Sequence, residues 1–158
     1  MENESSAKKA LDAAYRFLAR RPHSMMELKS KLSKKGFCAD LIENTIDSLC
    51  QQGYLNDEEV SLRWAQSLVQ GRGWGKAKIT FYLLQKGISR DIIEIVEKKI
   101  WQEFSEEEIA RKALKKHFSP YREIPPQGKM VTFLKSRGFS SEVIFKVASG
   151  LTVDEVIE

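Results

Sequence analysis

The chain has 158 residues, of which 42% are hydrophobic, and its 26 Lys and Arg exceed its 22 Asp and Glu to give a formal net charge of +4. No run of 18 apolar residues occurs, and residues 1–5 lack the basic and apolar regions of a secretory signal peptide, so we expect neither a membrane span nor export. The two cysteines, Cys38 and Cys50, form no C-x-x-C pair, and we expect them to be reduced thiols of a cytoplasmic protein.

Nine helical segments follow a polar stretch at residues 1–6 that we expect to be disordered. Capping residues, glycines and apolar residues at helical spacing mark these segments, and no segment alternates as a β-strand does, so the fold is predicted to be all-α. Ser24 and Glu27 have the spacing of a capping box, and residues 71–75 are predicted to be a flexible glycine-rich break. The expected helices cover 7–20, 25–35, 39–52, 57–70, 76–86, 90–104, 106–118, 128–137 and 140–149.

A short motif occurs three times: Lys35-Gly36-Phe37, Lys86-Gly87-Ile88 and Arg137-Gly138-Phe139. Each glycine lies 51 residues after the one before, and a leucine precedes each glycine by four positions. Self-similarity at a fixed period indicates a repeat architecture, in which each glycine ends a helix as a left-handed cap. The predicted order is a disordered N-terminus at 1–6, three-helix repeats at 7–55, 56–104 and 105–151, and an acidic tail at 152–158. Stacked repeats of this kind predict an extended solenoid.

The fragments that resemble catalytic or metal sites are incomplete. The glycine-rich segment before Lys76 would be a phosphate-binding loop only if a hydroxyl residue followed, and Ala77 stands there with no preceding strand. His23 and His117 have no Cys or His partner at a zinc-binding spacing. We therefore expect a protein that is not an enzyme and has no metal or cofactor.

Positive charge is concentrated in two stretches without acidic residues, which lie between Glu59 and Asp91 and between Glu108 and Glu123. Such segregation creates a local field that favours an anionic partner. Trp74 lies within the first stretch, where it can stack on a base or anchor an interface; alternatively, it packs under the turn and the cations form a solvated face. The candidate contact residues are Arg63, Arg72, Trp74, Lys76, Lys78, Lys86 and Arg90, with a second patch of Arg111, Lys112, Lys115 and Lys116.

One part of the sequence resembles a known family. Gly53-Tyr54-Leu55-Asn56-Asp57 precedes a helix, a glycine-rich turn and the segment Lys78-Ile79…Leu83…Lys86-Gly87-Ile88. This order is similar to the central signature of the RecX family, approximately G-Y-L-D-D, a helix, R-x-x-G-x-G and I-x-x-x-L-x-x-K-G-I. The chain departs from the pattern at Asn56, where the family has a second Asp, and at Val60-Ser61, where it has an aromatic residue and Ala.

This resemblance implies an elongated, curved helical protein that binds the filament of the RecA recombinase on DNA. It also implies inhibition of filament extension, ATPase, strand exchange and coprotease activity, without catalysis by the protein itself. The protein is expected to be monomeric and to use its basic faces on RecA, with single- or double-stranded DNA as a further partner.

The alternative is a direct DNA-binding protein, because three-helix units with short turns resemble helix-turn-helix domains. The third helix of the second repeat, however, is apolar and acidic rather than rich in the residues that contact base edges. A passive scaffold that binds peptides is a third possibility.

Overall fold

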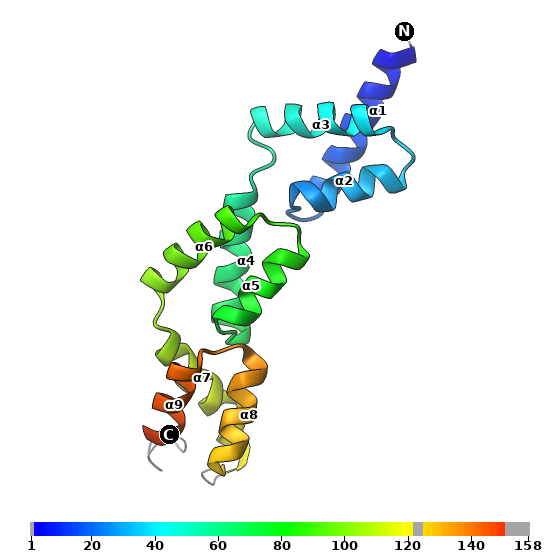
Figure 1. Cartoon of the computed structure of the whole chain (residues 1–158). Coiled ribbons are helices and arrows are strands. Elements are labelled where there is room, and N and C mark those ends of the chain that lie inside the picture. The colour runs from blue at the N-terminus through cyan, green and yellow to red at the C-terminus, as the bar shows by residue number, and fades with distance from the viewer. Residues whose placement is uncertain (1, 122–124, 151–158) are drawn as a thin grey trace. The chain divides into compact units, whose positions relative to one another are not determined.

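A computed structural model describes residues 2–121 and 125–150, in which the chain is all-α, as predicted (Figure 1). Nine α-helices and one 3-10 helix are present in this part of the chain, and it contains no strand. The helices are α1 (Glu2–Leu18), α2 (Met25–Lys34), α3 (Ala39–Gln51), α4 (Asp57–Arg72), α5 (Lys76–Gln85), α6 (Arg90–Glu103), α7 (Glu106–Phe118), η1 (Ser119–Tyr121), α8 (Gln127–Arg137) and α9 (Ser141–Gly150).

Two helix boundaries differ from the predictions. α1 begins at Glu2, so residues 2–6, which were expected to be disordered, are helical. α4 continues through Gly71 to Arg72, and the break that was expected over 71–75 is reduced to three residues. Gly73 closes α4 with a φ of 59°, and its N–H donates to the Val69 carbonyl oxygen, so the helix ends at the second of the three glycines rather than at Gly71. The predicted tail at 152–158 lies outside the described residues.

The three repeated glycines end α2, α5 and α8 in the left-handed conformation, with φ values of 88°, 75° and 81°, so their prediction as caps is confirmed. The residue after each glycine donates its N–H to the carbonyl oxygen of the leucine four positions before the glycine, at 3.4, 3.1 and 3.2 Å. These leucines, Leu32, Leu83 and Leu134, are fully buried. One residue type at this position therefore supplies both a backbone acceptor for the turn and a side chain for the core.

Contacts divide the chain into two compact units. The first unit comprises Met1–Ser61 and Leu83–Ile93, and the second comprises Leu62–Tyr82 and Glu94–Glu158. These limits fall inside α4, α5 and α6, so the units do not coincide with the three helix triplets. The repeat boundaries at 55 and 104 accordingly stay a prediction.

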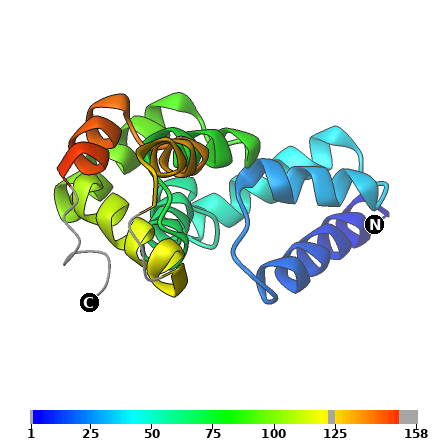
Figure 2. The ribbon, with the colours of Figure 1, turned by 90° about the horizontal axis from the view of Figure 1, so that it is seen from below.

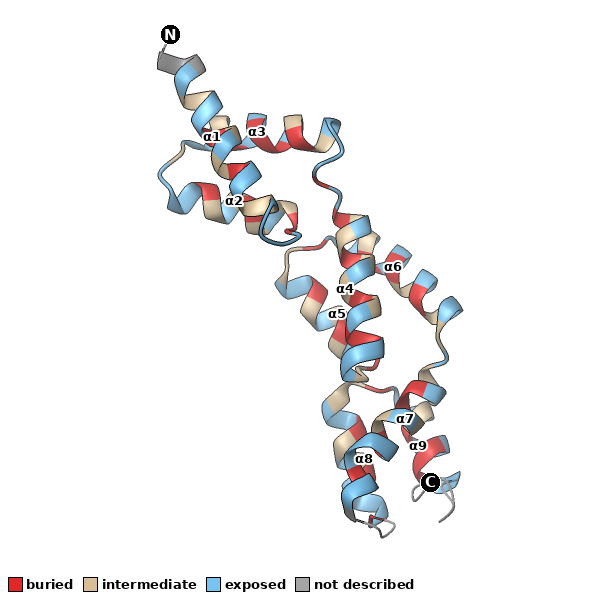
Figure 3. Ribbon diagram, turned by 180° about the vertical axis from the view of Figure 1, so that it is seen from behind, coloured by how far each residue is buried: buried red, intermediate tan, exposed pale blue. Residues whose placement is uncertain are grey.

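In the first unit, α1, α2 and α3 pack against one another around one apolar cluster (Figure 2). The buried residues lie on the facing sides of the helices (Figure 3), and full burial of each leucine contributes roughly 1.5–3 kcal/mol. The cluster consists of Ala14, Leu28, Leu32, Ile42, Ile46, Leu49 and Leu55.

In the second unit, α7, α8 and α9 pack in pairs in the same way. Their buried side chains include Ile109, Leu114, Met130, Leu134, Ile144 and Val147. Trp64 on α4 and Trp101 on α6 are half-buried. Large rings often keep an edge accessible, so this placement still agrees with a packing role.

Candidate partner-binding site

The first basic stretch surrounds the short loop that follows α4. Trp74 in this loop is half-buried, and its ring lies against Tyr82 with 6.0 Å between the ring centroids. The Lys78 ammonium is 4.8 Å from the Trp74 ring centroid, and the Arg72 guanidinium carbon is 5.4 Å away. Trp74 therefore packs under the turn and holds two of the cations, which is the arrangement that stabilises a cation over an aromatic face.

This loop is anchored to the C-terminal end of α8. The Gly75 N–H donates to the Arg137 carbonyl oxygen at 2.8 Å, and the Ala77 N–H donates to the Gly138 carbonyl oxygen at 3.0 Å. Lys78 Nζ donates to the Ser136 carbonyl oxygen at 3.0 Å. The carbonyls at a helix C-terminus carry partial negative charge, so they suit these donors. We call this contact the second junction; it holds the residues that the sequence predicted to be a flexible break.

A pocket of about 400 Å³ lies beside the second junction, between the end of α4 and the helices α7 and α8. Arg72 from the first basic stretch and Lys112 and Lys116 from the second line this pocket together. Arg137 and His117 also line it, and none of its described lining residues is acidic. We call it the cationic pocket. The complete lining is Val69, Gln70, Gly71, Arg72, Gly73, Ile109, Lys112, Ala113, Lys116, His117, Phe133 and Arg137.

Aromatic packing fixes one wall of the cationic pocket. The His117 imidazole stacks on the Phe133 ring, with 4.2 Å between centroids and 16° between planes. The Arg137 guanidinium lies 5.0 Å from the Phe133 centroid, and its Nη1 donates to the Arg72 carbonyl oxygen at 2.6 Å. Because these contacts hold the guanidinium before any ligand arrives, less side-chain entropy is lost when an anion binds.

The structure places the other predicted contact residues in several different settings. Lys76 Nζ lies 3.4 Å from a Glu97 carboxylate oxygen, and Arg111 pairs with Glu107 at 3.0 Å. Lys115 and Arg63 are exposed on α7 and α4. Two further residues, Lys86 and Arg90, belong to the first unit rather than to the unit that contains the cationic pocket.

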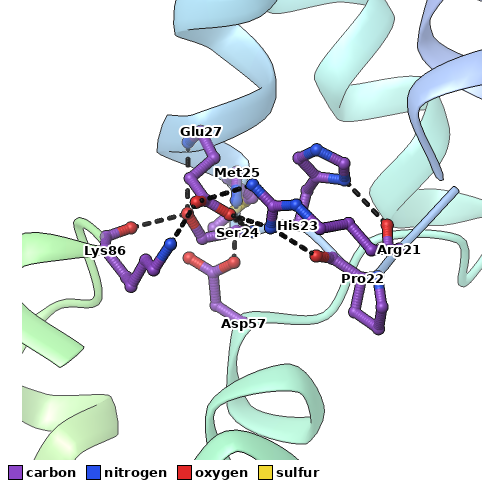
Figure 4. Close-up of polar contacts among 8 residues, drawn as sticks. All are labelled: Arg21, Pro22, His23, Ser24, Met25, Glu27, Asp57 and Lys86. Atoms are coloured by element: carbon purple, nitrogen blue, oxygen red, sulfur yellow. Dashed lines mark hydrogen bonds and ion pairs between the residues drawn. The ribbon is translucent and has the colours of Figure 1, made fainter. Parts of the chain in front are cut away.

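Lys86 is part of a polar network at the start of α2 (Figure 4). Its ammonium lies 2.7 Å from a Glu27 carboxylate oxygen, and only 25% and 17% of the two side chains are exposed. Arg21 donates to both Glu27 oxygens at 3.1 Å. The Ser24 hydroxyl donates to the Lys86 carbonyl oxygen at 2.6 Å, and the Met25 N–H donates to Asp57 Oδ1 at 2.8 Å. We call this network the first junction. It gives Lys86 a structural role that the sequence did not suggest.

The first junction shifts the pKa values of its two carboxyl groups in opposite directions. Burial alone raises the pKa of Glu27, but the hydrogen bonds from Arg21 and Lys86 outweigh burial and lower it to about 2. Burial raises the pKa of Asp57, and the single bond from the Met25 N–H offsets this only in part. Glu27 is therefore held as a carboxylate by cations, whereas Asp57 is held mainly as an acceptor for a helix N-terminus.

Three residues with charged or aromatic side chains line the cationic pocket but were not predicted as contact residues: Arg137, His117 and Phe133. Arg137 was interpreted only as the basic residue before a helix-ending glycine, and His117 only as a histidine without a partner at a zinc-binding spacing. A local signal was nevertheless available on α7, because Lys112 and Lys116 are four residues apart and share one helix face with His117 beside them.

This arrangement is suited to binding an anion. Among residues 2–121 and 125–150 no group of three His, Cys, Asp or Glu side chains could hold a metal ion. None of the described helices combines the length and the apolar composition needed to cross a membrane. Several fixed cations around a concave surface bind phosphate or carboxylate groups through charge-assisted hydrogen bonds.

The fold and the site thus define a class: a helical protein of tandem three-helix units with a cationic pocket. Two family models match the chain, RecX first three-helix domain at residues 10–49 and RecX second three-helix domain at residues 56–96. The chain belongs to the RecX family, as its central motif predicted.

Relatives of known name support this membership. The regulatory protein RecX of Legionella pneumophila (strain Corby) is 35% identical over 145 residues, covering 88% of this chain and 92% of the relative. That of Chlorobaculum tepidum is 33% identical over 144 residues, covering 90% of this chain and 88% of the relative. Solved structures match in fold. The crystal structure of RecX from Lactobacillus salivarius matches with a TM-score of 0.82 and 21% identity, covering 92% of this chain and 96% of that one. A second crystal structure, of a regulatory protein RecX, matches with a TM-score of 0.78 and 22% identity, covering 91% of this chain and 72% of that one.

Proposed function

We propose that this protein is a non-enzymatic, cytoplasmic regulator that binds the RecA filament on DNA and inhibits its extension, ATPase, strand exchange and coprotease activity. Membership of the RecX family, whose relatives are named regulatory proteins, supports this function. The observation that carries it is the cationic pocket, in which two basic stretches that are separate in sequence converge without an acidic residue in the described lining. A filament of protein on DNA offers anionic groups for such a site.

The contact surface that we propose is centred on the cationic pocket. Arg72, Lys112 and Lys116 were predicted from the sequence and line the pocket, and Arg137 is added to them. Trp74 in the adjoining loop and Lys78 in the first turn of α5 support this surface, whereas Lys86 is assigned to the first junction. Binding through several cations releases counterions, so the affinity for the filament should decrease steeply as salt increases.

Direct DNA binding is the second candidate function, and the absence of acidic residues from the described pocket lining supports it as well. α6 argues against sequence-specific reading of bases. It would be the recognition helix of the second triplet, yet it carries Asp91, Glu94, Glu97 and Glu103. Such a helix would be repelled by the phosphates on either side of a major groove.

Measurement of the RecA ATPase on single-stranded DNA tests the proposal. We expect inhibition by this protein at substoichiometric amounts, because a regulator that limits filament extension acts on many RecA subunits at once. Titration of the protein against bare single-stranded and duplex DNA at two salt concentrations serves as the control. An unchanged ATPase would contradict the proposed function. Tight binding to a particular DNA sequence without RecA would favour the second candidate.

A further inference from the structure

The two junctions place corresponding residues of the repeat in corresponding contacts. At the first junction, Ser24 and Met25 at the start of α2 donate to the Lys86 carbonyl oxygen and to Asp57. At the second junction, Gly75 donates to the Arg137 carbonyl oxygen at 2.8 Å, and the Lys76 N–H donates to Glu106 at 3.3 Å. Ser24 and Gly75 are 51 residues apart, as are Lys86 and Arg137. At both junctions the start of a helix in one copy contacts the end of the glycine-ended helix in the next copy: α2 contacts α5, and α5 contacts α8.

The space around the three repeated glycines shows which helix end lacks such a neighbour. A Cβ atom added to Gly87 would lie 2.1 Å from Met26 Sδ, and one added to Gly138 would lie 2.4 Å from the Lys78 backbone nitrogen. A Cβ atom added to Gly36 would have no described atom within 4 Å. The carbonyl oxygens of Lys86 and Arg137 accept hydrogen bonds at the two junctions. The corresponding carbonyl oxygen of Lys35 accepts no hydrogen bond from a described residue. The glycine-ended helix end that contacts a neighbouring helix in the second and third copies is therefore uncovered in the first copy.

A pocket of about 460 Å³ lies at this uncovered helix end, between α1 and the turn after α2. We call it the N-terminal pocket. Lys35 and Phe37 in its lining correspond to Lys86 and Ile88, which flank the glycine of the occupied first junction. The complete lining is Lys9, Asp12, Ala13, Arg16, Phe17, Arg20, Lys35 and Phe37.

The charge of the N-terminal pocket indicates what it can accept. Four cations and one carboxylate line it, and the Lys31 and Lys35 ammonium groups lie 4.8 and 5.7 Å from the Phe17 ring centroid. At the first junction α2 offers Glu27, in its first turn, to Lys86 at 2.7 Å. Lys35 occupies the position of Lys86 in the first copy, so an acidic residue in the first turn of an incoming helix would find the same partner.

We propose that the N-terminal pocket binds the N-terminal turn of an acidic helix supplied by another protein. The helix start would donate to the carbonyl oxygens at the end of α2, as the Ser24 hydroxyl donates to Lys86 at the first junction and the Gly75 N–H to Arg137 at the second. Its first-turn carboxylate would pair with Lys35, and further carboxylates would meet Arg16 and Arg20. This site lies in the first unit, and the inference does not depend on the function assigned to the cationic pocket.

A second copy of this chain fits the N-terminal pocket poorly. The helix start that corresponds to Ser24-Met25-Met26-Glu27 in the third copy is Pro126-Gln127-Gly128-Lys129. Lys129 would thus bring a positive charge to Lys35, and Pro126 provides no side-chain cap. Like charges placed opposite each other disfavour association, so the partner must differ from this chain.

A labelled peptide tests the proposal on the full chain. The probe is an acetylated helical peptide that starts with Ser-Met-Met-Glu and continues with Ala, Leu and Glu, and fluorescence anisotropy measures its binding at low salt. Charge reversal in the double variant Arg16→Glu, Lys35→Glu should weaken binding roughly tenfold or more, because it removes two charge-assisted contacts. The matched control Lys8→Glu, Lys34→Glu changes exposed neighbours outside the pocket lining by the same total charge and should alter binding less than about twofold. Circular dichroism checks that both variants keep their helices.

Five outcomes would overturn the proposal. The first three are no binding of the peptide, equal loss in the control variant, and equal binding of an unstructured poly-glutamate peptide. The fourth is a preference of this pocket for a single-stranded oligonucleotide over the peptide, which would make the ligand a nucleic acid. The fifth, measured by sedimentation, is self-association that Lys35→Glu abolishes, which would make the occupant a second copy. NMR chemical-shift changes of backbone amides that are confined to the turn at 35–37 and to α1 when the peptide is added would support the proposal.

Discussion

At the first junction, charged side chains hold the start of α2 against the end of α5, whereas at the second junction backbone groups hold the start of α5 against the end of α8. At the first junction the Glu27 carboxylate pairs with both Arg21 and Lys86. In the second case the Gly75 and Ala77 N–H groups reach helix carbonyls directly, and Gly75 is buried. The repeat thus preserves backbone positions and lets side chains differ. One junction becomes sensitive to pH and salt, and the other becomes a compact support for the cationic pocket.

Substitution of two of the repeated glycines by alanine should have the largest effect, and it compares the second junction with the uncovered helix end at Gly36. Gly138→Ala should lower the free energy of unfolding by about 3 kcal/mol or more, because a left-handed backbone costs about 1–2 kcal/mol and the new Cβ would also meet the Lys78 backbone at 2.4 Å. Gly36→Ala should cost only about 1–2 kcal/mol, because its left-handed backbone has an open surrounding. Urea unfolding of both variants measures the difference. Equal losses would show that the second junction is not close-packed.

Removal of the carboxylate at the first junction should have the next largest effect. Glu27→Gln should cost about 1.5–3 kcal/mol, since hydrogen bonds to a charged group are lost and Lys86 remains partly buried. Glu43→Gln is the matched control: Glu43 pairs with Lys29 at 2.7 Å, but both side chains are well exposed, so its loss should stay below about 1 kcal/mol. Similar values for the two variants in urea unfolding would contradict the special role of the first junction.

The pH dependence of stability should report on the same network. The pKa of Glu27 falls from its ordinary 4.5 to about 2 in the folded protein, so its contribution is complete above pH 4.5 and is lost between pH 4.5 and about 2. Burial lowers the pKa of His23 below its ordinary 6.5, so stability should already start to decline as pH falls below 6.5. Unfolding midpoints across this range, compared with those of Glu27→Gln, check the prediction. A variant curve parallel to the wild-type curve below pH 4.5 would contradict it.

The smallest effect is expected at Asp57. Asp57→Asn keeps an oxygen that can accept the Met25 N–H, and it removes a carboxylate whose pKa is raised chiefly by burial. A raised pKa means that the charged form is disfavoured in the folded state, so loss of the charge should change the free energy of unfolding by less than about 1 kcal/mol near neutral pH. Asp57→Leu provides the contrast, because it leaves the helix N–H unsatisfied and should cost about 1–3 kcal/mol. Equal losses in the two variants would rule out the acceptor role.

Much of the fold could be predicted because its determinants are local. Gly36, Gly87 and Gly138 end helices by their own backbone freedom, and Ser24 and Glu27 form the predicted capping box at 3.1 and 3.4 Å. The two helix boundaries were predicted wrongly because sequence patterns distinguish poorly between a helix that ends and one that continues for another turn. α4 tolerates Gly71 within the helix, and the polar residues at 2–6 extend α1.

The candidate site could be predicted only in part, because its residues meet across long separations. Arg137 binds the carbonyl group of a residue 65 positions away, and Lys86 pairs with a carboxylate 59 positions away. An acid-free stretch shows where cations accumulate but says nothing of partners from elsewhere in the chain. This explains why Lys86 was interpreted as a contact residue and why Arg137 was missed.

The central claim is that the cationic pocket carries the regulation of RecA. Its most direct test is the RecA ATPase on single-stranded DNA in the presence of the double variant Lys112→Glu, Lys116→Glu. Both side chains are exposed on α7, so the fold should persist, and Lys98→Glu, Lys129→Glu is a control with the same change in charge outside the pocket lining. We predict at least a roughly tenfold higher concentration for half-inhibition by the pocket variant and an unchanged value for the control. Equal inhibition by the wild type and the pocket variant would contradict the claim.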